Sequence, residues 1–189
     1  MTGMTIEDYV RAIRFKVNTT EPKLVVPIEL KTDVTWRSRA ERLYMLDLLS
    51  VVLPQEDKAM RARLAPLQAI PAMSSFTIAA LINIITAGLR DDAAYLNIGV
   101  WHGYSLLAGM LGNSEKRVIG VDNFSGFGSP REAFGAAFER HRSSRHTFFD
   151  MDSTVYLAEH HEGPVGFYFY DGDHSYEAQL GGLEACEPF

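Results

Sequence analysis

The sequence predicts an α/β fold: a doubly wound parallel sheet preceded by an N-terminal helical segment. From about residue 94 onward, short apolar runs alternate with helical patterns in four consecutive strand–helix units. Repeated units of this kind require a parallel sheet with helices on both faces. Glycine-rich and polar segments follow the expected strands, which is where an open parallel sheet binds its ligand.

Length and composition restrict the class of protein. A chain of 189 residues suits one domain, with room for a small appendage. Apolar residues make up 47% and charged residues 22%, which argues against intrinsic disorder. The net charge of −6 argues against a nucleic-acid partner, which needs a basic face. The single cysteine, Cys186, excludes an internal disulfide and a thiolate metal cluster.

Neither a membrane span nor an export signal is predicted. The most apolar stretch, residues 76–89, contains Asn83 and is shorter than the roughly 20 residues that cross a bilayer. Residues 1–10 carry Glu7 and Asp8 and lack the apolar core of a signal peptide. We therefore expect a soluble, cytoplasmic protein without a membrane partner.

The helices and strands are predicted in order along the chain. In residues 1–73 we expect one helix over about 6–13 and another over about 36–53. Ser74 or Ser75 can cap a helix over 76–87, with Gly88 as its left-handed C-cap. The segments that follow are predicted as strands at 94–100, 117–121, 146–149 and 166–170, and as helices at 104–111, 130–138, 154–160 and 175–185.

Glycines follow the first of these strands, in the segment from Asn97 to Ser105. Gly99 and Gly103 allow the backbone to approach a ligand closely where the next helix begins. Their spacing is neither the dinucleotide-binding pattern nor a phosphate-binding loop with its lysine. A tight strand–helix turn without a ligand is the alternative.

Acidic residues follow the second and third strands. Asp122 lies about 20 positions after the glycine turn, the spacing at which a carboxylate accepts from ribose hydroxyls. Its alternative role is to cap a turn or helix. Asp152 and Ser153 offer polar groups near an adenine, or equally the N-cap of the next helix.

Two carboxylates and an imidazole follow the fourth strand. Asp171 and Asp173 offer oxygen ligands suited to Mg²⁺, Mn²⁺ or Ca²⁺, and His174 can act as a base near neutral pH. The alternative is that Asp173 only caps the following helix. The spaced ligands of an EF-hand are absent from this segment.

Three segments resemble motifs of class I S-adenosylmethionine-dependent methyltransferases: residues 95–105, 118–128 and 171–177. They are most similar to the macrocin O-methyltransferase-like group, some of whose relatives are labelled cephalosporin hydroxylases. The resemblance covers about residues 74–189. It implies a Rossmann-like domain over 74–189 that binds S-adenosylmethionine, preceded by a helical lid segment over 1–73.

The resemblance also implies roles for individual residues. His174 and Asp171 become the candidate catalytic residues, and Asp171 the candidate metal ligand, with Mg²⁺ as the candidate ion. The cofactor contacts implied are Asn97, Gly99, Gly103, Ser105, Asp122, Asn123, Phe124, Asp152, Ser153 and Asp171.

The chain departs from the family pattern in two places. Asn97 stands where the family usually has Glu or Asp, so a negative charge facing the cationic cofactor is lost. The family sheet has the strand order 3-2-1-4-5-7-6, but this sequence stops where a fifth strand should follow. We therefore expect that C-terminal strands are missing and that the chain is part of a longer domain. The strand over 166–170, although apolar on both faces, would then lie at an edge that favours dimerisation or aggregation.

The expected function is S-adenosylmethionine-dependent O-methylation of a small metabolite or sugar. A metal held partly by Asp171 would lower the pKa of the acceptor hydroxyl, and His174 would take the proton. Asn97 and the early stop favour an alternative, a non-catalytic or incomplete nucleotide-binding module. A second alternative is an NAD-dependent oxidoreductase: Asp122 suits it, but the glycine spacing and the Asp171–His174 cluster do not.

Overall fold

The computed structural model describes residues 6–12, 14–15, 51–52, 57–126 and 128–189. The chain divides into two compact units, residues 1–81 and 82–189, and helix α4 (Phe76–Ala87) crosses their boundary. None of the helices in these described ranges is long and apolar enough to cross a bilayer.

The first unit contains short elements. Helix α1 (Ile6–Ala12) precedes strand β1 (Arg14–Phe15), which pairs antiparallel with β2 (Val51–Val52). The helix predicted over about 36–53 is wrong at residues 51–52, and its remainder lies outside the described residues. Two consecutive β-branched residues favour extended backbone, and β1 supplies the pairing partner.

Two further elements of this unit were not predicted. Helix α3 (Asp57–Leu64) leads directly into the 3₁₀-helix η1 (Ala65–Ala69). Met60, Leu64 and Leu67 are buried. Their spacing of four and three positions is the apolar pattern of a helix face, so the sequence did contain a signal for these elements.

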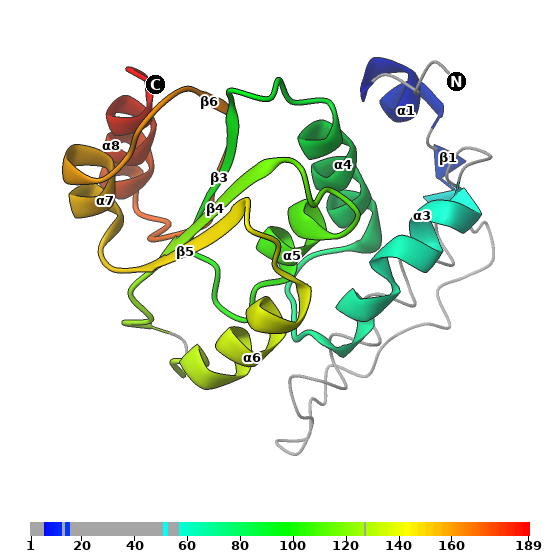
Figure 1. Cartoon of the computed structure of the whole chain (residues 1–189), viewed down its shortest axis with the longest axis horizontal. Helices are drawn as coiled ribbons and strands as arrows, with labels where there is room; N and C mark the ends of the chain where they lie inside the picture. The colour runs from blue at the N-terminus through cyan, green and yellow to red at the C-terminus, as the bar shows by residue number, and fades with distance from the viewer. Residues whose placement is uncertain (1–5, 13, 16–50, 53–56, 127) are drawn as a thin grey trace. The chain divides into compact units, whose positions relative to one another are not determined.

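The second unit is a parallel four-stranded sheet with helices packed on it (Figure 1). The strand order β5-β4-β3-β6 confirms the 3-2-1-4 order that the sequence predicted for these four strands. The strands are β3 (Ala94–Ile98), β4 (Arg117–Asp122), β5 (His146–Asp150) and β6 (Val165–Tyr170). The helices are α5 (Tyr104–Met110), α6 (Arg131–His141), α7 (Ser153–Glu159) and α8 (Tyr176–Cys186).

The two faces of this sheet are covered by different helices, as a doubly wound fold requires. Helices α5 and α6 lie on one face, and α7 and α8 lie on the other (Figure 1). Alternate residues of β3 and β4 form the core beneath α7 and α8, including Leu96, Ile98 and Val121. On the other face Gly109 of α5 lies against the ring of Tyr95, which is fully buried.

The end of α4 differs from the prediction. Gly88 is absent from the described glycines with positive φ, so it is not a left-handed C-cap. Its N–H instead donates to the carbonyls of Ile84 and Ile85, both at 3.1 Å, and continues the helical hydrogen-bonding pattern. At the other end, the hydroxyl of Ser75 accepts from the N–H of Ile78 at 3.3 Å, as expected for a cap.

Strand β6 lies at one edge of the four-stranded sheet, although its sequence is apolar on both faces. Most of its residues are half-buried rather than buried. The N–H of Val165 donates to the carbonyl of Phe189 at 3.0 Å, so the last described residue lies beside the start of this strand.

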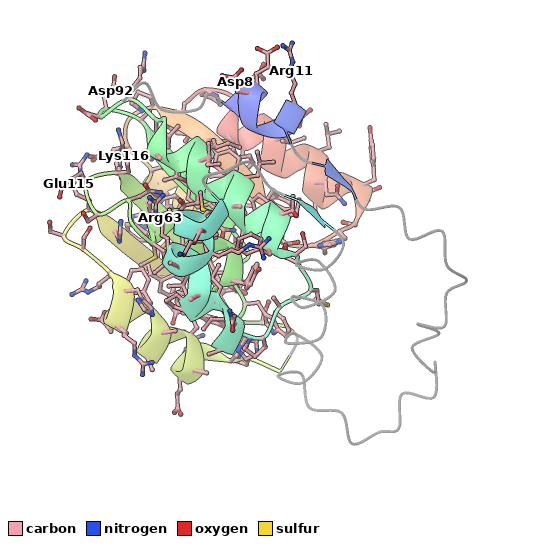
Figure 2. The ribbon with its side chains drawn as sticks, turned by 90° about the vertical axis from the view of Figure 1, so that its right-hand side faces the viewer. Asp8, Arg11, Arg63, Asp92, Glu115 and Lys116 are labelled. Carbon is pink, nitrogen blue, oxygen red and sulfur yellow. The ribbon has the colours of Figure 1, made fainter. Side chains whose placement is uncertain are left out.

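Charged side chains lie in the loops just before β3 and β4. Figure 2 shows Asp92, Glu115 and Lys116 near the starts of β3 and β4. The ammonium group of Lys116 donates to the Leu89 carbonyl at 2.6 Å and to the Asp91 carboxylate at 3.1 Å. These contacts tie the loop before β3 to the loop before β4. The polar segments considered below lie at the opposite, carboxyl ends of the strands, where open parallel sheets bind ligands.

Candidate active site

The loops that follow β3 and β6 are in direct contact. The N–H of Asp171 donates to the Ile98 carbonyl at 2.8 Å. A Cβ atom at Gly99 would lie 2.3 Å from the carbonyl oxygen of Asp171, and the φ of Gly99 is +78°. Only glycine fits both this contact and this backbone conformation. The glycine segment and the Asp171 segment are therefore brought together, as their positions after two neighbouring strands predict.

The carboxylate of Asp122 joins two loops at the strand ends. One oxygen, Oδ2, accepts from the N–H groups of Val100 and Trp101 at 2.9 and 2.8 Å. The other, Oδ1, accepts from the N–H of Phe124 at 2.7 Å. Trp101 and Phe124 both have positive φ, at 48° and 52°, a costly conformation outside glycine. Asp122 thus holds both loops in shapes that they would not adopt alone.

Asn97 lies beneath the glycine loop rather than on its surface. The residue is fully buried, and its Oδ1 accepts from the Ser105 hydroxyl at 2.7 Å and the Tyr95 hydroxyl at 3.3 Å. Burial raises the pKa of Tyr95 well above its ordinary value, and the negative charge of Asp171 raises it further. Asn97 and Ser105, both predicted as cofactor contacts, here support the loop from inside.

Gly103 ends the glycine loop and begins α5. Its φ is +92°, and a Cβ there would lie 2.7 Å from the ring of Phe134. Its N–H donates to the Val100 carbonyl at 2.6 Å, which closes a tight turn. The structure therefore contains the tight strand–helix turn that the sequence analysis gave as the alternative.

Asn123 and Phe124 differ in exposure. Asn123 is exposed, and its Oδ1 accepts from the N–H of Ser125 at 3.0 Å. The ring of Phe124 is buried, with centroids 5.7 Å from those of both Phe134 and Phe148. The Phe124 side chain therefore belongs to an aromatic cluster, and its backbone is what faces the Asp122 carboxylate.

Asp152 is the N-cap of α7. Its carboxylate accepts from the N–H groups of Thr154 at 2.8 Å and Val155 at 3.4 Å, and Ser153 is the first residue of the helix. Hydrogen bonds from the Thr154 side chain and backbone hold the pKa of Asp152 below its ordinary value of 3.8. The capping alternative accounts for this carboxylate without a ligand.

Replacing Asp152 with alanine is expected to lower the free energy of unfolding by about 1 kcal/mol at pH 7. The pKa of Asp152 is lower in the folded than in the unfolded chain. The stabilisation is therefore complete above the unfolded value and is lost as the pH falls through the folded one. Urea unfolding at several pH values tests this, with Asp152→Asn, which keeps a capping oxygen, as the control. An alanine variant as stable as the parent at pH 7 would contradict the capping role.

Asp171 and His174 form a pair in the loop after β6. His174 Nε2 lies 3.3 Å from Asp171 Oδ1, with the side chains 74% and 54% exposed. Asp173 points elsewhere: its Oδ1 accepts from the N–H of Ser175 at 2.7 Å. Ser175 in turn is the N-cap of α8. Asp171 is therefore paired with an imidazole, whereas Asp173 accepts a backbone hydrogen bond within the turn before α8.

The metal expected from the resemblance does not fit the described residues. Among them, no three His, Cys, Asp or Glu side chains come together as a metal site requires. The carboxylate of Asp171 is paired with His174, and that of Asp173 with the backbone. The described residues therefore offer no set of side chains that would hold Mg²⁺.

Arg131 was not predicted as a site residue. It is the first residue of α6, yet its guanidinium contacts the loop after β4 and the end of β5. It forms an ion pair with Asp150, donates to the Asn123 carbonyl at 3.1 Å and lies over the Phe124 ring at 5.0 Å. The sequence pointed to Arg131 only through its position at the start of a helix that follows the end of β4.

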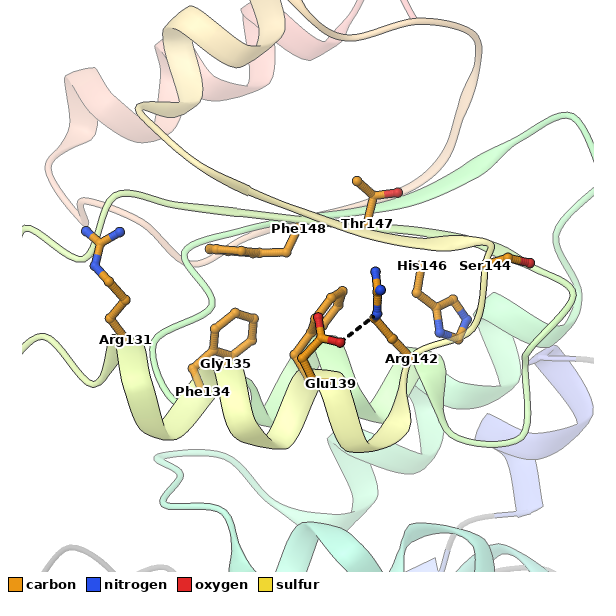
Figure 3. A pocket seen from close by; sticks show the side chains of 10 residues that line it. Arg131, Phe134, Gly135, Glu139, Arg142, Ser144, His146, Thr147 and Phe148 are labelled. Carbon is orange, nitrogen blue, oxygen red and sulfur yellow. Dashed lines mark ion pairs between the residues drawn. The ribbon is translucent and has the colours of Figure 1, made fainter.

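A cavity of about 440 Å³ lies away from most of these residues. It runs between α6 and the edge strand β5, and the rings of Phe134 from α6 and Phe148 from β5 line it (Figure 3). Arg142 in its wall is paired with Glu139 at 2.9 Å. Arg131 lines this cavity and also contacts the loop after β4 through the Asn123 carbonyl, and the rings of Phe134 and Phe148 do so through Phe124.

These features define an α/β domain whose polar residues meet at the carboxyl ends of a parallel sheet. Residues 96–189 match the sequence model of a family described as a methyltransferase domain. This similarity to a methyltransferase domain agrees with the resemblance of the motifs and with the Rossmann-like fold. Among curated proteins, none matches the chain.

Proposed function

We propose that this protein is an S-adenosylmethionine-dependent O-methyltransferase that acts on a hydroxyl of a small metabolite or sugar. The observation that carries the proposal is the contact between Gly99 and the Asp171 backbone. Through it the glycine loop lies beside the Asp171–His174 pair at the carboxyl ends of β3 and β6. A cofactor loop and a proton acceptor are thus neighbours. The same motifs support the macrocin O-methyltransferase-like group as the subfamily.

The residues around the glycine loop fit S-adenosylmethionine. Gly99 and Gly103 both have positive φ and shape the turn after β3, and the Asp122 carboxylate lies beside this turn. A carboxylate has about four lone-pair positions, and three backbone N–H groups use Asp122, so one position remains for a ribose hydroxyl. When bound, the cofactor supplies an electrophilic methyl group on a positively charged sulfur.

His174 is the proposed general base. A proton on Nε2 donated to Asp171 leaves Nδ1 to accept the proton of the acceptor hydroxyl. Asp171 fixes the orientation and tautomer of the ring, as a carboxylate does for a catalytic histidine. The side chain of Gln179 donates to the His174 carbonyl at 2.8 Å and anchors the loop that carries the base. The exposure of His174 leaves it open to an acceptor from solvent.

A methyl-transfer assay tests the proposed reaction. The protein is incubated with S-adenosylmethionine carrying a labelled methyl group and a panel of sugars, phenols and aliphatic alcohols. We expect label in at least one acceptor and an equal amount of S-adenosylhomocysteine. Tight cofactor binding with no transfer to any member of the panel would favour the non-catalytic binding module.

Replacing Asp122 with alanine is expected to weaken S-adenosylmethionine binding by about tenfold or more. The variant loses an acceptor for the ribose, at roughly 0.5–1.5 kcal/mol per hydrogen bond, and releases the N–H groups of Val100 and Trp101. Isothermal titration calorimetry measures the change. Asp92→Ala, an exposed residue before β3 that pairs with Arg90, is the matched control. An unchanged Kd for the Asp122 variant would remove this residue from the site.

A further inference from the structure

Arg131 makes three contacts with two separate parts of the chain. It ion-pairs with Asp150 at the end of β5, donates to the Asn123 carbonyl and covers the Phe124 ring. Its side chain and that of Asp150 are 49% and 41% exposed. An ion pair at such exposure contributes little by itself. The significance of Arg131 therefore lies in its two contacts with the loop after β4.

That loop has a strained conformation which something must maintain. The φ of Phe124 is +52°, and its N–H donates to Asp122 Oδ1. If Phe124 relaxed to negative φ, this donor would turn away from the carboxylate. The aromatic cluster holds the Phe124 ring from one side through Phe134 and Phe148, and the guanidinium contacts the ring as well. A planar guanidinium can stack on a ring and donate to a carbonyl at the same time, which an ammonium cannot do.

We infer that Arg131 is a positioning residue that holds the loop after β4 so that the Asp122 carboxylate is ready for the cofactor ribose. The inference deepens the proposed function and rests on it. Arg131 acts through Phe124 and Asp122 and need not touch the ligand. Its ion pair with Asp150 also links the loop after β4 to the end of β5.

The direction in which cofactor affinity changes distinguishes a positioning role of Arg131 from a simple effect of its charge. S-adenosylmethionine carries a net positive charge, so removing the charge of Arg131 should by electrostatics alone strengthen its binding. Loss of positioning weakens it instead. S-adenosylhomocysteine lacks the sulfonium charge but has the same ribose. Positioning therefore predicts equal losses for both ligands, whereas a charge effect predicts a change confined to S-adenosylmethionine.

The test compares Arg131→Ala and Arg131→Lys with Arg142→Ala in the full chain. Arg142 follows the same helix, and within the described part of the chain its guanidinium pairs with Glu139 of that helix, so it is a matched control. We expect Arg131→Ala to raise the Kd of both ligands by about tenfold, Arg131→Lys by about threefold, and Arg142→Ala by less than twofold. In turnover, the KM for S-adenosylmethionine should rise with little change in kcat.

A second readout needs no ligand. Hydrogen exchange at the Phe124 amide should accelerate by about tenfold in Arg131→Ala and stay unchanged in Arg142→Ala. If the parent protein binds neither ligand while this exchange still accelerates, the proposed function fails and the positioning of Phe124 stands. Parental Kd values and parental exchange in Arg131→Lys or Arg131→Ala would overturn the inference. If Arg131→Ala does not fold, Arg131→Lys decides by the same two readouts.

Discussion

Replacing His174 with alanine is expected to lower methyl-transfer turnover by roughly 10²–10⁴-fold, the usual contribution of a general base. The imidazole is held 3.3 Å from the Asp171 carboxylate in an exposed loop beside the glycine turn. Its removal leaves water as the proton acceptor. Because the ring pairs with Asp171 and, in the described part of the chain, forms no hydrogen bond to the glycine loop, the Kd for S-adenosylmethionine should stay within about twofold.

Steady-state kinetics with labelled cofactor measure this loss, and calorimetry measures cofactor affinity in the same variant. His160→Ala is the control, since His160 is an exposed histidine at the end of α7. Asp171→Asn should also lower turnover, because the neutral amide stabilises the protonated imidazole less than a carboxylate does. Parental turnover of His174→Ala between about pH 6 and 9 would show that His174 only shapes the turn before α8.

Replacing Gly99 with alanine is expected to have the largest effect on stability. The added methyl group would lie 2.3 Å from the Asp171 carbonyl oxygen, and 2.8 Å from the N atom of Gly172. The φ of +78° adds backbone strain for any residue with a Cβ. Strain and overpacking together should lower the free energy of unfolding by about 3 kcal/mol or more.

Chemical denaturation tests this, with Gly135→Ala as the matched control. A Cβ at Gly135, inside helix α6, meets no atom within 4 Å. The control should therefore be neutral or stabilising by about 0.5–1 kcal/mol, the ordinary gain of alanine over glycine in a helix. If Gly99→Ala is as stable as Gly135→Ala, the loops after β3 and β6 do not meet as described.

The second unit was largely predictable because its local signals agree with its tertiary structure. Buried strands such as β3 are short apolar runs, and helix α8 begins within one residue of its predicted start, with Ser175 as its N-cap. The strand order followed from the resemblance. Strand β5 also extends to Asp150, one residue further than predicted, because Asp122 and Asp150 are partners in the β4–β5 register.

The site was less predictable, because sequence spacing does not show which way a side chain points. Asn97 and Phe124 fall within the quoted motifs, yet both are buried. The buried contacts come from other elements of the fold: Ser105 of α5 for Asn97, and Phe134 of α6 and Phe148 of β5 for Phe124. Arg131 was missed for the same reason, since its partners become its neighbours only in the folded sheet.

In the first unit, local patterns were misleading. Val51 and Val52 continue an apolar pattern that reads as helix, but pairing with Arg14 and Phe15 makes them a strand. The pairing partner lies more than 30 residues away in sequence, beyond the window in which periodicity is read. Helix α3 is different, because its regular apolar spacing does indicate a helix.

The most direct test of the proposed function is to measure which cofactor the protein binds. Isothermal titration of the parent protein with S-adenosylmethionine, and separately with NAD, requires no knowledge of the acceptor. We expect saturable one-to-one binding of S-adenosylmethionine and S-adenosylhomocysteine, with no heat from NAD. The proposal places the cofactor site of a methyltransferase at the carboxyl ends of β3 and β4, beside Gly99 and Asp122. The absence of S-adenosylmethionine binding, or saturable binding of NAD in its place, would contradict it.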